Sequence, residues 1–239
     1  MATTATMPAP PRRYVQAAAA LHTVFLLVML AGWALLGWIM VNRMITSANP
    51  HRMRNYALTF CFEWLAFAYV IAGVRRHGES ALTVLGTRWS SFRELLRDIG
   101  IAAAFWLAAA GILQLVGGFL FAHTPRPNQE FLLPHRAGEL LAWIALSVSA
   151  GICEETIFRG YLQRQFAAFT RSAPAGIVLS AMAFGVGHAY QGSRMTILIG
   201  IYGLLFGLLA HWRGSVRPGM IAHAWQDSLS GLVGLLKLR

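Results

Sequence analysis

Apolar residues fill most of the chain in long windows, and short polar stretches separate these windows. A helix needs roughly 20 mainly apolar residues to cross about 30 Å of hydrocarbon. The pattern therefore predicts an all-α membrane bundle of about seven transmembrane helices. No internal repeat is evident, which disfavours a transporter built from duplicated halves. The predicted spans cover residues 15–42, 56–74, 98–122, 137–169, 174–190, 195–212 and 218–236.

The polar stretches divide the rest of the chain. Residues 1–13 contain three prolines and predict a disordered N-terminal tail, so that 14–239 would form a single membrane domain. In 78–98, leucines and aromatic residues recur at mixed three- and four-residue steps among polar residues. This spacing predicts an amphipathic helix lying on the membrane surface. The proline-containing stretch 123–136 is typical of an exposed loop.

Composition supports the same class. Hydrophobic residues make up 56% of the 239 residues and charged residues only 12%, whereas about a quarter charged is usual in soluble domains. The net charge of +11 is distributed between the apolar windows. We therefore expect loops that face anionic membrane lipid, and no nucleic-acid partner, because nucleic-acid binding requires a clustered basic face.

The N-terminal region and the cysteines add two expectations. Arg12 and Arg13 precede an apolar run much longer than the core of a signal peptide, so we interpret it as a retained span. A slight excess of arginine on that side of the spans predicts a cytoplasmic N-terminus, in what we expect to be a bacterial plasma membrane. Cys61 and Cys153 lie in apolar windows without metal-ligand spacing, which predicts two small buried side chains.

Two adjacent carboxylates interrupt the fourth window, which reads LLAWIALSVSAGICEETIFRGYL. They are Glu154 and Glu155, and Arg159 follows four residues after the second. A carboxylate at membrane depth is costly, so it indicates a functional site. Residues four apart on a helix share a face, whereas neighbours point about 100° apart. We expect Glu155 to pair with Arg159 and Glu154 to face elsewhere as a general base; alternatively, the pair only locks helices together.

The last helices carry further polar residues at similar depth. His188 follows Gly185 and Gly187, which would let another helix approach closely. His211 ends the sixth window, beside Trp212, and is expected at the interface.

His223 and Asp227 lie one helical turn apart, so the carboxylate could orient the imidazole or, if protonated, help it bind an oxyanion. Counted from the helix ends, Glu155 and His223 have similar depths and could meet. The chain has no HExxH or GxSxG motif and no evident Ser-Lys pair. The remaining chemistry is a water molecule activated by Glu and His, with or without a metal.

Three short motifs now give a specific resemblance. EETIFR, FGVGH and HAWQD follow one another on three late helices. In this order they resemble the motifs of the CAAX-protease and bacteriocin-processing family, the Abi-type intramembrane proteases related to the type II CAAX prenyl endopeptidase. The resemblance covers about 137–231, which would be the catalytic core, and implies an intramembrane endopeptidase that cuts peptide bonds near the membrane face.

The resemblance also implies roles. Glu154 would activate water with the help of His188. His223 and the residue at position 227 would hold the oxyanion, with Glu155 and Arg159 organising the site. Position 227 is often Asn in relatives, so Asp227 departs from the pattern and its role there is open.

The resemblance leaves the metal and the substrate open. Either Glu154, His188 and His223 bind a divalent metal such as zinc, as the metalloprotease description of some members implies, or Glu and His act without a metal. The substrate would be a peptide or protein, and prenylation is not implied. Two other functions stay open: a non-catalytic scaffold or bacteriocin-immunity protein of the same fold, and a proton-coupled carrier.

Overall fold

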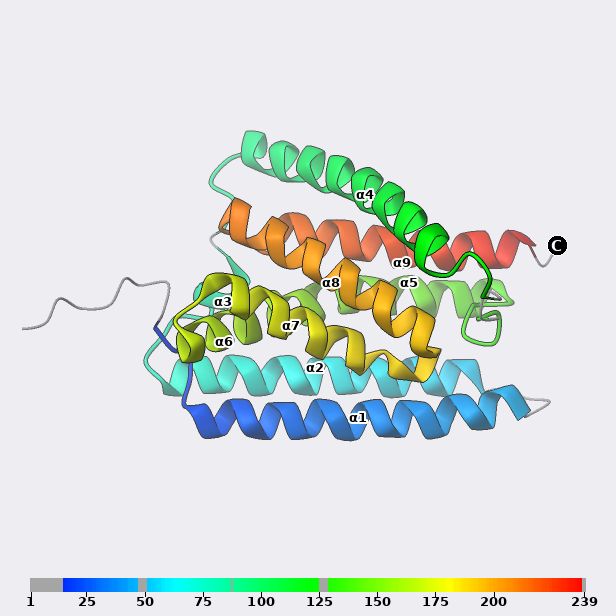
Figure 1. Ribbon diagram of the computed structural model, residues 1–239, viewed down its shortest axis with the longest axis horizontal. Coiled ribbons are helices and arrows are strands. Elements are labelled where there is room, and N and C mark those ends of the chain that lie inside the picture. The colour runs from blue at the N-terminus through cyan, green and yellow to red at the C-terminus, as the bar shows by residue number, and fades with distance from the viewer. Residues whose placement is uncertain (1–14, 47–50, 87, 125–128, 238–239) are drawn as a thin grey trace, which may run out of the picture.

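The computed structural model describes residues 15–46, 51–86, 88–124 and 129–237, and within them every regular element is a helix (Figure 1). The predicted tail, 1–13, lies outside the described residues. The helices are α1 (Ala20–Thr46), α2 (Arg52–Arg76), α3 (Leu82–Leu85), α4 (Phe92–Leu120), α5 (Ala137–Glu154), η2 (Glu155–Leu162), α6 (Gln163–Thr170), α7 (Ala173–Gly187), η3 (Ala189–Gln191), α8 (Ser193–Arg213) and α9 (Arg217–Lys237).

The long helices pack as a closed ring. α1 contacts α2, α2 contacts α5, α5 contacts α9 and α9 contacts α4; α4 then contacts α8, α8 contacts α7, and α7 returns to α1. In Figure 1 the α1–α2 pair and α4 lie at opposite edges of the bundle, with α5, α8 and α9 between them. This closure leaves an interior space that all these helices can line.

The outer surface of the ring is apolar. Within the described residues, five helical segments are long and apolar enough to cross a membrane: α1, α2, α4, α8 and the continuous stretch Ala137–Thr170. Large side chains such as Leu115, Phe119 and Leu141 are more than 70% exposed on this surface. Apolar side chains can face outward when lipid is the solvent. The prediction of an all-helical integral membrane protein is thus confirmed.

The predicted surface helix at 78–98 differs in the structure. α3 spans only four residues and ends at Gly86, whose φ of 82° falls in the left-handed region that favours glycine. α4 then starts at Phe92, because Ser91 accepts a hydrogen bond from the Glu94 N–H and the Glu94 carboxylate accepts one from the Ser90 N–H. The amphipathic segment is therefore divided between α3 and the first turns of a spanning helix.

The predicted fourth span is continuous but not uniform. α5, η2 and α6 form one 34-residue helix, and its middle eight residues, Glu155–Leu162, are wound as a π-helix. All eight are buried. Nothing in the sequence pattern indicated this winding, which is rare and frequently found at functional sites.

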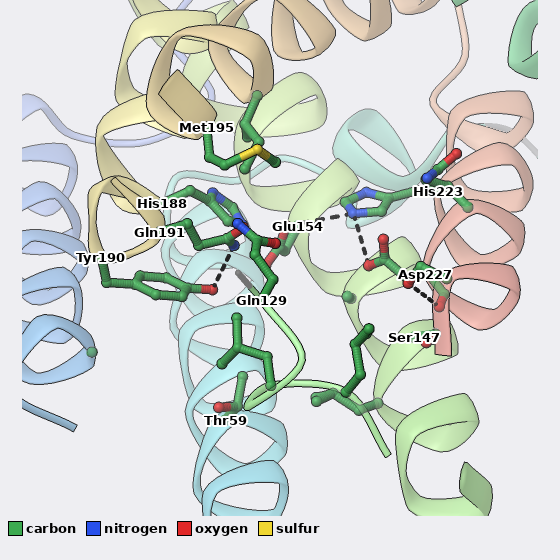
Figure 2. A pocket seen from close by; sticks show the side chains of 18 of the residues that line it. Thr59, Gln129, Ser147, Glu154, His188, Tyr190, Gln191, Met195, His223 and Asp227 are labelled. Atoms are coloured by element: carbon green, nitrogen blue, oxygen red, sulfur yellow. Dashed lines mark hydrogen bonds and ion pairs between the residues drawn. The ribbon is translucent and has the colours of Figure 1, made fainter. Parts of the chain in front are cut away.

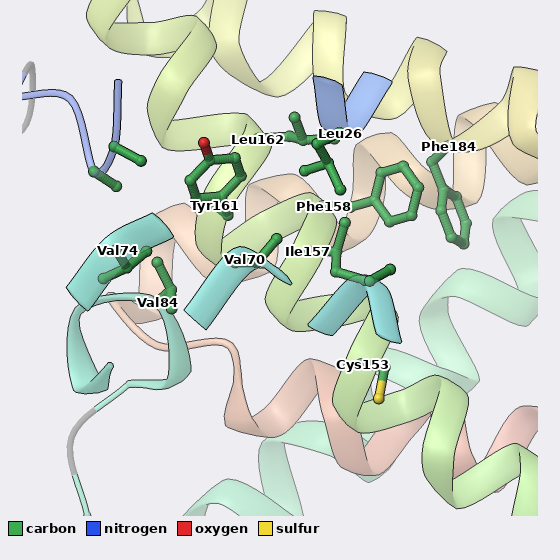
Figure 3. Packing of buried hydrophobic residues seen from close by; sticks show 13 residues of the cluster. Leu26, Val70, Val74, Val84, Cys153, Ile157, Phe158, Tyr161, Leu162 and Phe184 are labelled. Carbon is green, nitrogen blue, oxygen red and sulfur yellow. The ribbon is translucent and has the colours of Figure 1, made fainter. Parts of the chain in front are cut away.

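Apolar packing and polar contacts both fix the position of the π-helical segment. Its apolar residues Ile157, Phe158 and Leu162 belong to the main core, where they meet residues of α1 and α2 (Figure 3). The hydroxyl of Tyr161 contacts both His22 Nδ1 and Thr23 Oγ1, each at 2.9 Å. Because buried polar groups are costly when unpaired, this satisfied network fixes the segment against α1.

Candidate active site

The two helices that carry most of the site cross at a glycine. A Cβ atom added to Gly151 on α5 would lie 2.6 Å from the backbone oxygen of Met220 and 3.1 Å from the Cβ of Ala224, both on α9. Only a residue without a side chain lets the two backbones come this close. The crossing lies one turn before Glu155, the first residue of η2, and close to His223 on α9.

Glu155 and Arg159 form the predicted pair. Arg159 donates from NH1 to Glu155 Oε1 at 2.8 Å, and both side chains are 1% exposed. The guanidinium also donates to the Gly203 oxygen at 3.3 Å and lies 4.2 Å from the centroid of the Phe184 ring. The predicted meeting of Glu155 with His223 is also confirmed, because His223 Nδ1 lies 3.1 Å from the same Oε1 atom.

Carboxylates surround the imidazole of His223. Its Nδ1 donates to Glu155, while its Nε2 lies 3.8 Å from Glu154 Oε2 and 3.5 Å from Asp227 Oδ2. Figure 2 shows Glu154 and Asp227 directed toward this nitrogen. Glu155 thus contacts Nδ1 and Asp227 contacts Nε2, so that a carboxylate lies at each nitrogen of the ring. Glu154 does face away from Arg159, as predicted, but it shares His223 with Glu155.

A cavity of about 620 Å³ lies inside the helix ring. It is lined by Glu154, His188, His223 and Asp227, whereas Glu155 and Arg159 are not part of its wall. From these residues it extends toward the end of the bundle where α1 ends and α2 begins. Glu154 Oε2 is buried, has no hydrogen-bond partner within the described part of the chain and lies 3.8 Å from His223 Nε2. The Glu154 side chain as a whole is 19% exposed and lines the cavity.

His188 ends α7 and reaches the same cavity. Its Nδ1 lies 2.9 Å from the Phe184 oxygen, and because a carbonyl oxygen only accepts, Nδ1 carries the hydrogen. In the neutral ring Nε2 then has a free lone pair. The predicted close approach of a helix holds at Gly185, where an added Cβ would lie 2.7 Å from the Thr196 oxygen, but it is wrong at Gly187, which has open space.

A further carboxylate, which the sequence patterns did not single out, completes the cavity wall. Glu63 on α2 lines the cavity, is 5% exposed, and accepts a hydrogen bond from Ser149 Oγ at 2.6 Å. It lies in the middle of the predicted span 56–74. The cost of a carboxylate at membrane depth, which drew attention to Glu154, applies equally to this residue and could have found it.

The metal set suggested by the resemblance does not fit these positions. Among the described residues, no group of three or more His, Cys, Asp or Glu side chains is arranged to hold a metal ion. Two ring nitrogens already bind protein acceptors, one in His188 and one in His223. Glu154, His188 and His223 therefore line one cavity without forming a coordination shell.

Two minor predictions have mixed outcomes. His211 is exposed near the end of α8, where an interfacial residue is expected. Cys153 is buried, as predicted, but Cys61 is exposed on the outer surface of α2, so the prediction of burial is wrong there. Neither cysteine forms a disulfide.

The comparison with protein families agrees with this geometry. Residues 136–229 match the Rce1-like family, described as type II CAAX prenyl endopeptidase Rce1-like. The resemblance drawn from the three motifs is thereby confirmed over this Rce1-like region, which supports a function of the intramembrane CAAX protease type. The searches of curated proteins and of solved structures found no match. The matched region contains Glu154, His188 and His223, whereas Glu63 lies before it.

Proposed function

We propose that this chain is an intramembrane endopeptidase that hydrolyses peptide bonds with a water molecule activated by Glu154. One observation carries the proposal: three helices of the Rce1-like region direct Glu154, His188 and His223 into a single cavity inside the ring. A cavity with a few convergent polar groups is the usual form of an active site.

Glu154 is the general base in this mechanism. Its Oε2 atom has no hydrogen-bond partner in the described chain, and its side chain is 19% exposed toward the cavity. A water molecule between Glu154 and His188 can donate one hydrogen to the carboxylate and one to the free lone pair of His188 Nε2. Both side chains then orient the water oxygen for attack on a peptide carbonyl.

His223 holds the charge that develops in the reaction. The imidazole has carboxylate acceptors at both of its nitrogens, and only the protonated ring has hydrogens for both. Its Nε2–H points into the cavity and can donate to the oxyanion as the water oxygen bonds to the carbonyl carbon. Glu154 then returns the proton to the peptide nitrogen, the C–N bond breaks, and the products are a carboxylic acid and an amine.

The test is the Glu154→Gln variant, assayed in detergent with a library of internally quenched apolar peptides. General acid–base catalysis contributes about 10²- to 10⁴-fold, so we expect the cleavage rate to fall by at least 10²-fold. Glu79→Gln is the matched control, because Glu79 contacts Thr83 outside the cavity. The proposal is wrong if the parental protein cleaves no member of the library, or if Glu154→Gln cleaves at the parental rate.

The same experiment distinguishes an endopeptidase from a non-catalytic scaffold. If the polar cluster were only structural, Glu154→Gln would lower the melting temperature and the parental protein would show no cleavage. We expect the opposite result, because Glu154 Oε2 accepts no hydrogen bond from the described residues and its ion-pair contact with His223 Nε2 is long, at 3.8 Å.

A further inference from the structure

The charged side chains in the cavity wall are predominantly negative. Three carboxylates line it, those of Glu63, Glu154 and Asp227, and no described Arg or Lys side chain does. The nearest buried cation, Arg159, is bound to Glu155 behind the wall. Even with His223 protonated, negative charge exceeds positive charge on this surface. A charge buried away from water is costly unless an opposite charge is close to it.

Of the three carboxylates, Glu63 has the least compensation of its negative charge by nearby donors and cations. It is 5% exposed, and its only hydrogen bond in the described chain comes to Oε2 from the neutral hydroxyl of Ser149. Its other oxygen accepts no hydrogen bond from the described residues. Glu154 and Asp227, which act on it electrostatically, carry the same sign of charge, and His223 is held by its own carboxylates. A buried acceptor directed into a cavity and lacking a cation is suited to a cation that arrives with a ligand.

Resting on the endopeptidase function proposed above, we propose that Glu63 binds a cationic side chain of the substrate. The substrate class is then an apolar peptide segment with a Lys or Arg close to the scissile bond. Glu63 would be the residue that determines this specificity, and Glu154 would act on the bond itself.

The positions of Glu63 and Glu154 along the bundle determine how many residues separate the basic residue from the scissile bond. Ser149, which binds Glu63, precedes Glu154 by five residues, a rise of about 7.5 Å along the helix. An extended peptide advances about 3.3–3.6 Å per residue, so the two carboxylates lie about two residues apart along a bound substrate. Asn55 and Thr59 continue the same face of α2 toward the open end of the cavity. Glu63 thus lies between the entrance and the reacting groups.

The rest of the wall suits apolar neighbours of that basic residue. Methionine, valine and leucine side chains form part of the remaining surface, beside aromatic rings and several amide and hydroxyl groups; among them are Met40, Val41, Leu113, Leu132 and Leu198. The same wall is unsuited to a substrate whose free C-terminal carboxylate must enter the cavity. Such a group would meet three carboxylates and, among the described lining residues, no Arg or Lys.

The first experiment uses peptides alone and needs no variant. One quenched apolar peptide is made with Lys, norleucine or Glu at the second residue on either side of its cleavage site, and kcat/KM is measured for each. We expect the Lys peptide to exceed the norleucine peptide by about 10- to 100-fold, as for a hydrogen bond to a charged group, and the Glu peptide to be the poorest. Equal values for Lys and norleucine would overturn the inference and leave the endopeptidase function intact.

The second experiment assigns the preference to Glu63. In Glu63→Gln, the ratio of kcat/KM for the Lys and norleucine peptides is expected to fall to about one, whereas Glu79→Gln keeps the parental ratio. A ratio that persists in Glu63→Gln would show that another group binds the cation. Because the readout is a ratio, a general loss of activity does not imitate the expected result.

A binding measurement separates this inference from the proposed function. Fluorescent Lys and norleucine peptides are titrated into Glu154→Gln and into Glu63→Gln/Glu154→Gln. We expect at least tenfold tighter binding of the Lys peptide to the first protein and no difference for the second. If the parental protein cleaves nothing but this binding preference is found, the endopeptidase function fails and the cation site stands. Equal binding of both peptides to Glu154→Gln contradicts the cation site.

Discussion

Removing one partner of the Glu155–Arg159 pair should destabilise the protein far more than removing both. In Arg159→Met, the Glu155 carboxylate stays buried, with His223 as its remaining donor. Both partners are 1% exposed, so solvent cannot compensate. Loss of one member of a buried ion pair costs about 3–5 kcal/mol. At about 2–4 °C per kcal/mol for a chain of this size, the melting temperature should fall by about 6–20 °C.

The double variant Glu155→Gln/Arg159→Met should recover most of this loss. No charge is then left without a partner, and the glutamine oxygen can still accept from His223 Nδ1. The hydrogen bond from Arg159 to the Gly203 oxygen stays lost, at about 1 kcal/mol. We therefore expect the double variant to melt within about 2–4 °C of the parental protein.

Thermal melts in detergent for the parental protein, both single variants and the double variant give the complete cycle. The cleavage rate should not recover together with stability, because the neutral residue at 155 no longer supports a positive charge on His223. We expect it to remain at least ~10-fold below the parental rate. The reasoning is refuted if the double variant melts at or below the temperature of Arg159→Met, since the buried pair would then contribute stability beyond mutual compensation.

Two further substitutions test the position and charge of the reacting groups. Gly151→Ala places a Cβ 2.6 Å from the Met220 oxygen, so α5 and α9 must separate, and we expect the cleavage rate to fall about 10²-fold. Gly118→Ala is the control: its added Cβ meets open space, and we expect cleavage at the parental rate. Asp227→Asn replaces a carboxylate 3.5 Å from His223 Nε2 with an amide that can donate to the oxyanion, so kcat for the norleucine peptide should rise. A tenfold fall in kcat would instead indicate that the ionised carboxylate orients the imidazole.

The helices and the polar pairs within one turn could be predicted because their signals are local. Each apolar window became a helix, since lipid requires every backbone group to be satisfied within its own segment. The Glu155–Arg159 contact follows from a spacing of four residues. The meeting of Glu155 with His223 followed from comparing their depths along two helices. The depth of each residue along its helix predicted that the two side chains meet, but it did not predict which atoms are in contact.

Contacts that depend on distant segments were not predictable. Asp98 is fully buried and binds Arg213 at 2.8 Å and Trp89 at 2.9 Å, and the sequence patterns did not single it out. Arg213 is 115 residues away in the chain, and no local pattern connects the two. The start of α4 is a different case, because the Ser-Phe-Arg-Glu capping signal was present in the sequence and was masked by the amphipathic spacing around it.

The different surroundings of the two adjacent glutamates depend on His223 more than on the glutamates themselves. Both lie at the start of the π-helical segment and both approach the same imidazole, yet Glu155 is bound behind the cavity wall and Glu154 lines the cavity. The crossing at Gly151 places the ring between them, so its two nitrogens face different partners. A shift of α9 would therefore disturb the buried pair and the reacting carboxylate together.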